Sequence, residues 1–206
     1  MPRYSLNPLF HDFEQNIEQI FGIIDILSVE PQSLNRDTHI EGCFIRGVVA
    51  WENFIEEYVL RCMCSAKTRR GTILKPLATC SSDTENAFKK IHPLRKARDK
   101  DYLDWLNDES LKTFVENSFH HSSRLQDIYE DTSRLFMMSI IRNAIAHRSK
   151  SAISKFQKHA ISQFGYLATT NPTMAELLIT KKRSNQKLIF KDLLGYYVGL
   201  ADDLTK

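Results

Sequence analysis

Glycine and proline are scarce in this chain, with 7 and 6 among 206 residues. Both residue types mark turns and strand ends, and no alternating stretch between turn signals predicts a β-hairpin. The scarcity therefore favours long helices joined by a few loops. Apolar residues make up 42% of the chain and charged residues 26%, which is typical of a globular core and excludes a disordered or fibrous class.

Long hydrophobic runs are also missing. No stretch approaches the roughly 18 apolar residues of a membrane span, and the segment MPRYSLNPLFHDFEQ lacks the apolar centre of a signal peptide. We therefore expect a cytoplasmic protein with no membrane partner. We interpret residues 1–206 as a single helical domain with a long basic connection at 67–99 and a C-terminal helical extension at 166–206.

Cysteine is limited to Cys43, Cys62, Cys64 and Cys80, and a reducing compartment disfavours disulfides between them. A zinc site formed by Cys62, Cys64, Cys80 and His92 is an alternative. However, residues two apart on a helix point about 200° apart around its axis. We therefore interpret the cysteines as buried structural residues and expect no metal and no cofactor.

Positive charge is in small excess, since the net charge is +3 and the isoelectric point is about 8.6. This value permits a nucleic-acid partner without requiring one. Lysine and arginine are frequent in the 67–99 connection, which we interpret as a solvated loop with a short helix near 84–91. Phosphate binding by this loop is the less favoured alternative.

Apolar residues at spacings of three and four predict a first helix over 8–29, which ends before Pro31. Ser33 is the expected cap of a second helix from 34 to about 66. The middle of that helix is apolar around much of its circumference, as in the centre of a bundle, with Arg46, Glu52 and Glu56 embedded in it.

The rest of the chain also reads as helical. The expected helices cover 100–117, a long segment from Ser122 or Ser123 through 147, 151–163, a segment capped by Asn171-Pro172-Thr173 that runs to about 182, and 189–204. The expected fold class is all-α, a bundle with two long core helices and additional C-terminal helices.

The run Arg142-Asn143-Ala144-Ile145-Ala146-His147 follows a nearly wholly apolar segment, 133–141. Polar side chains on such a helix are costly to bury unless they are paired. Asn143 and His147 are four apart and share a face with Phe136 and Ile140. Arg142 and His147 are five apart, about 140° around the axis, so the helix bends or ends near 144–146, or two copies share a site in a symmetric dimer.

These residue types suit RNA cleavage. Histidine near neutral pH can take the 2′-hydroxyl proton or protonate the leaving 5′-oxygen. Arg142 would hold the scissile phosphate and stabilise its transition-state charge, and Asn143 would orient His147 or bind phosphate. RNA supplies its own nucleophile, so this chemistry needs no metal and excludes DNA. The alternative is an interface histidine beside an arginine near a helix C-terminus, where cations are favoured.

The Arg-x4-His spacing, with a polar residue straight after the arginine, resembles the signature of the HEPN superfamily. The segment Ala50-Trp51-Glu52-Asn53-Phe54-Ile55-Glu56-Glu57 resembles the first-half helix of its RiboL-PSP-HEPN branch, and the likeness covers roughly residues 8–165. The resemblance implies a homodimer with a composite site, metal-free endoribonuclease activity that leaves a 2′,3′-cyclic phosphate, and a toxin or anti-phage defence role with an antitoxin or defence-system partner.

Two further residues join the candidate site. Glu52 is expected to support Arg142 or His147, with a buried salt bridge to Arg46 as the alternative. Arg148 is a candidate RNA contact, or an ordinary exposed arginine. The pair His120-His121 is interpreted as a turn, because adjacent residues face apart on a helix.

Two other function classes compete with the ribonuclease. One is a non-catalytic HEPN-like module that binds RNA or protein. The other is a helical scaffold for a partner protein that uses residues 67–99 or the C-terminal helix, although this leaves the polar run unexplained. The sequence does not identify the RNA, the activating trigger or the partner.

Overall fold

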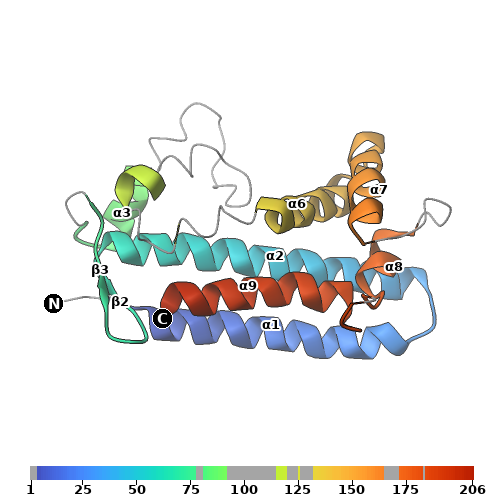
Figure 1. Ribbon diagram of the computed structural model, residues 1–206, viewed down its shortest axis with the longest axis horizontal. Coiled ribbons are helices and arrows are strands. Elements are labelled where there is room, and N and C mark those ends of the chain that lie inside the picture. Colours follow the sequence, from blue (N-terminus) through green and yellow to red (C-terminus); the bar gives the residue numbers. More distant parts are fainter. Residues whose placement is uncertain are drawn as a thin grey trace. The chain divides into compact units, whose positions relative to one another are not determined.

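Helix dominates the computed structural model, which describes residues 4–77, 81–91, 115–119, 125, 132–164, 172–182 and 184–206. The elements in chain order are β1 (Tyr4–Ser5), α1 (Leu6–Val29), α2 (Leu34–Met63), β2 (Ala66–Lys67), β3 (Ile73–Leu74), α3 (Thr84–Ile91), α6 (Thr132–His147), α7 (Lys150–Phe164), α8 (Met174–Leu178) and α9 (Ile189–Thr205) (Figure 1). The expectation of a mostly helical protein is confirmed. In the part of the chain that the structure describes, no helix combines the length and apolar content needed to cross a bilayer.

The chain divides into two compact units. One unit comprises residues 1–14, 51–132 and 199–206, and the other comprises residues 15–50 and 133–198. Each of α1, α2 and α9 contributes one part to each unit.

An aromatic cluster forms the core of the first unit. The Phe13 ring lies 4.9 Å from that of Phe54 and 6.0 Å from that of Trp51 between ring centroids. The Tyr58 hydroxyl donates to the Leu204 carbonyl oxygen at 3.1 Å and so ties α2 to the end of α9. Trp51, Phe54 and Tyr58 follow one another on α2 at spacings of three and four residues, so a helix places their rings on one face.

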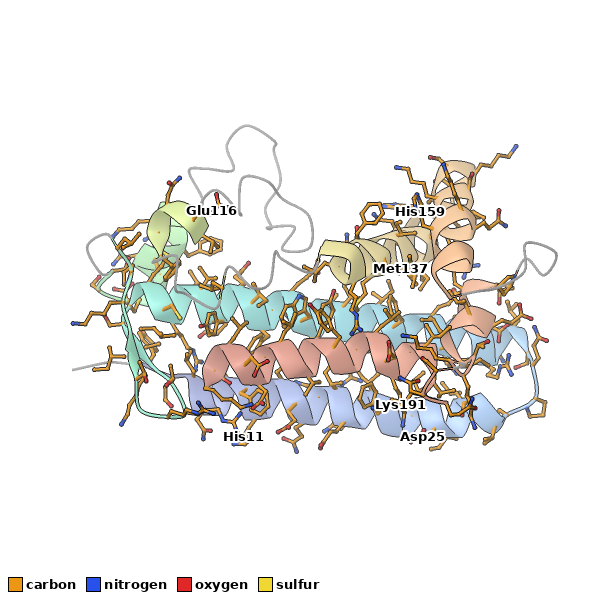
Figure 2. The ribbon with its side chains drawn as sticks, in the orientation of Figure 1. His11, Asp25, Glu116, Met137, His159 and Lys191 are labelled. Carbon is orange, nitrogen blue, oxygen red and sulfur yellow. The ribbon has the colours of Figure 1, made fainter. Side chains whose placement is uncertain are left out.

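The second unit packs parts of α1, α2 and α9 together with α6, α7 and α8. Phe44 of α2 meets Phe190 of α9 edge to face, with ring centroids 5.8 Å apart. On the side of α1, the ammonium group of Lys191 lies 2.7 Å from the carboxylate of Asp25, and both residues are labelled in Figure 2. Apolar packing thus joins α9 to α2, and an exposed ion pair joins it to α1.

Three two-residue strands form a small sheet that the sequence analysis did not anticipate. Strand β1 pairs parallel to β2, and β2 pairs antiparallel to β3 with Ala66 opposite Leu74. Gly71 has a φ of 89° in the connecting turn, a conformation that glycine adopts without steric cost. The strands are too short to show the alternation of a hairpin, and the expectation of an unstructured connection is therefore wrong for residues 66–74.

Most helix boundaries agree with the sequence-based expectation to within a few residues. The backbone N–H of Arg36 donates to the Ser33 side chain at 3.2 Å, which confirms Ser33 as the cap of α2. Helix α8 is shorter than expected, because it ends at Leu178, and its cap is Thr173 in a capping box with Glu176. The expected helix over 100–117 and the start of the long segment before residue 132 lie largely outside the described residues.

Candidate functional site

Helix α6 carries the Arg142–His147 run at its C-terminal end. The helix extends from Thr132 to His147 and ends directly after the run. Within one chain Arg142 and His147 therefore stay about 140° apart around the helix axis. Apart from Ser139, the side chains buried on this helix are apolar: Leu135, Met137, Met138, Ile140, Ile141 and Ala144.

The polar side chains of the run become more exposed toward the helix end. Arg142 and Asn143 are half-buried, and His147 is exposed. The Asn143 amide donates to the Ser139 hydroxyl at 3.5 Å, one turn earlier on the same helix. Asn143 thus bonds back along α6, and the proposed role of orienting His147 rests on position alone.

Arg148 ends α6 in a left-handed backbone conformation, with a φ of 45°. Its N–H donates to the Ala144 carbonyl oxygen at 3.1 Å, which closes the last turn of the helix. Its guanidinium lies 2.6 Å from the carboxylate of Glu41 on α2, with exposed side-chain fractions of 59% for Arg148 and 9% for Glu41. The end of the run is therefore attached to α2 by a partly buried ion pair.

Glu41 is in an unfavourable place for a carboxylate. Burial raises the pKa of Glu41 above its ordinary value, Arg148 opposes the rise through its charge and hydrogen bond, and Asp37 one turn earlier adds to it. Glu41 was not predicted from the sequence, because a glutamate near the start of an apolar helix resembles any solvated residue. Its pairing with Arg148 depends on contacts between distant parts of the chain.

A pocket of about 330 Å³ opens beside this ion pair, with Glu41, Arg148, Phe156 and Met174 among its lining residues. Helix α7 begins directly after Arg148, and the Ser149 hydroxyl accepts from the Ala152 N–H at 3.2 Å as its cap. The run, the ion pair and the start of α7 thus lie together.

A second missed signal is the distribution of acidic residues. No aspartate or glutamate occurs between Asp131 and Glu176, the longest such stretch in the chain. The stretch contains six cations that count toward the net charge: Arg134, Arg142, Arg148, Lys150, Lys155 and Lys158. This stretch therefore carries a net charge of +6, the same as the basic connection at 67–99, within a chain whose total is only +3.

Glu52 is half-buried on α2. Its supporting role stays a prediction. Arg46, which was expected to be embedded in the bundle, is exposed. Burial of the cysteines is confirmed for Cys62 and Cys64, and Cys43 is half-buried.

The alternative zinc site would involve Cys62 and Cys64. Among the described residues, no group of three or more His, Cys, Asp or Glu side chains is placed to hold a metal ion. Burial raises the pKa of the Cys62 thiol to about 12, which makes this group a structural thiol rather than a nucleophile. Cys80, His92 and the pair His120-His121 lie outside the described residues.

Comparison of the chain with models of protein families, with curated proteins and with solved structures gave no match.

Proposed function

We propose that this protein is a metal-independent endoribonuclease of the HEPN type. The observation that carries the proposal is the position of His147, which is exposed at the C-terminal end of α6 and belongs to a segment without acidic residues. Arg142 and Asn143 precede it by one turn. An imidazole and a guanidinium in positive surroundings are suited to act on a phosphodiester.

Proton transfer and charge stabilisation would divide between the two side chains. An imidazole removes the 2′-hydroxyl proton, the 2′-oxygen attacks the adjacent phosphorus, and the 5′-oxygen leaves with a proton. The products are a 2′,3′-cyclic phosphate and a free 5′-hydroxyl. Arg142 stabilises the additional charge on the phosphoryl oxygens, and Asn143 and Arg148 contact neighbouring phosphates. DNA lacks the nucleophile and is not a substrate.

A homodimer completes the site in this proposal. Because Arg142 and His147 point in different directions on one helix, a single chain does not easily aim both at one phosphate, whereas two copies related by a twofold axis offer each other their runs. The likeness to HEPN proteins also extends the proposal to a role as a toxin or anti-phage defence effector, with an antitoxin or defence-system partner.

The test is cleavage of single-stranded RNA by the full-length protein with and without EDTA. We expect His147→Ala to lower the cleavage rate by about 100-fold or more, since general acid–base catalysis contributes on that scale. His39→Ala is the matched control, because His39 is an exposed histidine on α2. Full activity of His147→Ala, or activity that EDTA abolishes, contradicts the mechanism.

The second candidate function is an HEPN-like module that binds RNA without cleaving it. The acid-free basic segment favours this alternative as much as it favours the enzyme, since cations alone support binding. RNA that binds and is recovered intact under all conditions, with equal affinity for wild type and His147→Ala, would identify this function.

A further inference from the structure

Helix α6 presents one large aromatic side chain to solvent. Phe136 is 43% exposed on a helix whose other large apolar residues are mostly buried. It lies on the same face as Asn143 and His147, at spacings of seven and eleven residues. The ring of His159, a residue of α7 labelled in Figure 2, makes an edge-to-face contact with the Phe136 ring, with centroids 5.6 Å apart and planes at 84°. The packing of His159 against the Phe136 ring holds Phe136 in place.

Two lysines on α7 flank this aromatic pair. Lys155 and Lys158 are both exposed, and they precede His159 by four residues and by one. Lys155 therefore lies one turn from His159 on the same side of the helix, and Lys158 is three residues from Lys155. The exposed hydroxyl residues Ser151 and Ser154 continue this side toward the N-terminus of α7.

The opposite side of α7 packs into the core. Phe156 is 1% exposed and faces the same pocket as Glu41 and Arg148. Helix α7 is therefore anchored by its apolar side, and the side with the lysines faces solvent. No acidic residue of α6 or α7 competes for these lysines, because both helices lie within the acid-free stretch.

We infer that Phe136, His159, Lys155 and Lys158, named here the α6–α7 surface, bind single-stranded RNA beside the candidate site. The lysines contact successive phosphates, and an unpaired base stacks on the exposed part of the Phe136 ring. Proteins that bind single strands combine cations that follow the backbone with aromatic platforms in this way. The inference rests on the proposed function and adds to it the strand type and the residues that hold the strand.

Chemistry favours RNA over the other anionic partners. A helix that binds membrane surfaces inserts its apolar side into the lipid, whereas the apolar side of α7 is buried in the protein. An acidic polypeptide would satisfy the lysines but offers no planar group for Phe136. Duplex RNA keeps its bases stacked inside the helix, so it would contact only the lysines.

The experiment measures binding of a fluorescent uridine 12-mer by the full-length protein carrying His147→Ala, which prevents cleavage. The test variants are Lys155→Gln/Lys158→Gln and Phe136→Leu. The matched control is Lys181→Gln/Lys187→Gln, which removes the same charge from two exposed lysines of the same unit. Affinity is recorded over a series of salt concentrations, and a duplex RNA and poly-glutamate serve as competitors.

We expect the double lysine variant to reduce the slope of log affinity against log salt concentration by about 1.4, since each phosphate contact on a single strand contributes about 0.7. Phe136→Leu should weaken binding about five- to a hundred-fold without changing that slope, because stacking is not ionic. The control should behave like the parent protein. Poly-glutamate should compete poorly.

An equal effect of the control lysines, an unchanged affinity in Phe136→Leu, or equal competition by duplex RNA or poly-glutamate overturns the inference. These outcomes are separable from the failure of the proposed enzyme. If binding follows the expected pattern but the wild-type protein, which retains His147, cleaves no RNA, the ribonuclease proposal is refuted and the α6–α7 surface is supported. If the wild-type protein cleaves RNA and the α6–α7 substitutions do not change the cleavage rate, the ribonuclease proposal is supported and the α6–α7 surface is refuted.

Discussion

Arg148 combines a backbone cost with a side-chain gain. A residue with a β-carbon in the left-handed region costs on the order of 1 kcal/mol relative to glycine, and Arg148 adopts this region with a φ of 45°. Its ion pair with Glu41 offsets part of this cost. It also offsets part of the cost of burying the Glu41 carboxylate, whose exposed fraction is only 9%. The two residues therefore depend on each other more than an exposed pair would.

Substitutions in this pair should have effects that depend on pH. Arg148→Ala leaves the buried carboxylate of Glu41 without its partner, so the free energy of unfolding at pH 7 should fall by about 1 kcal/mol, because one partner is largely exposed. A carboxyl whose pKa is raised in the folded state stabilises the fold as pH falls through that pKa. The loss should therefore shrink on acidification. Urea unfolding at several pH values measures it.

Glu41→Gln is the control for the same experiment, because it removes the titrating group. Adding Arg148→Ala to Glu41→Gln should cost less than Arg148→Ala alone at pH 7 and should show little dependence on pH. A penalty for Arg148→Ala that grows on acidification would contradict the assigned role of Glu41.

At the scale of elements, the packing of α2 on α9 depends on a glycine. A β-carbon built on Gly47 would lie 2.4 Å from Leu194 Cδ1 and 3.0 Å from Cδ2, whereas one built on Gly42 has no atom within 4 Å. Leu194 is fully buried, so its displacement would disturb the neighbouring core. Gly47 therefore allows α2 and α9 to approach, and Gly42 has no such role.

Alanine at the two glycines should have opposite effects on stability. Gly42→Ala should raise the free energy of unfolding by about 0.5–1 kcal/mol, since alanine is the better helix former and the site is open. Gly47→Ala makes the same gain but overpacks Leu194, a change that typically costs about 1–3 kcal/mol. Thermal or urea unfolding of both variants measures the difference. Equal stabilisation by both would show that Leu194 moves freely.

The sequence predicts the helices better than it predicts their partners. The apolar spacing of α1 and α2 fixes their helical character, because residues three and four apart share a face whatever covers it. The ion pair of Arg148 with Glu41 joins residues 107 positions apart, and no local pattern encodes it. The exposure of Phe136 was equally unreadable, since periodicity shows that a face is apolar but not that it is covered.

The strands show a different limit. Each is two residues long, which is too short for alternation to register. The pairing of Tyr4 with Ala66 depends on the ends of the first two long helices being near each other. Such contacts follow from the tertiary fold, so they are not readable before it.

At the scale of the whole molecule, the proposed enzyme requires two copies of the chain. Because α6 stays helical as far as His147, Arg142 and His147 of one copy point about 140° apart and do not easily reach one phosphate together. A site that takes Arg142 from one copy and His147 from the other remains. Such a division is testable without knowing the natural substrate.

Mixing two inactive variants should restore activity. In a heterodimer of Arg142→Ala with His147→Ala, one of the two shared sites keeps both side chains. With random exchange half of the dimers are mixed, so about a quarter of wild-type activity should return. Each variant mixed with itself is the control, and the RNA cleavage rate is the readout. Recovery no greater than the controls would place Arg142 and His147 of one site on the same chain.

The concentration of positive charge in one acid-free stretch also affects how fast the protein meets RNA. A nearly neutral protein experiences little net attraction to a polyanion at long range, but a local excess of cations turns the molecule as it approaches. Diffusional encounters then begin with the basic segment facing the strand, and association accelerates by an amount that salt screens over about 10 Å at 0.1 M. The segment that carries His147 and the connection at 67–99, each with a net charge of +6, would both contribute to this attraction.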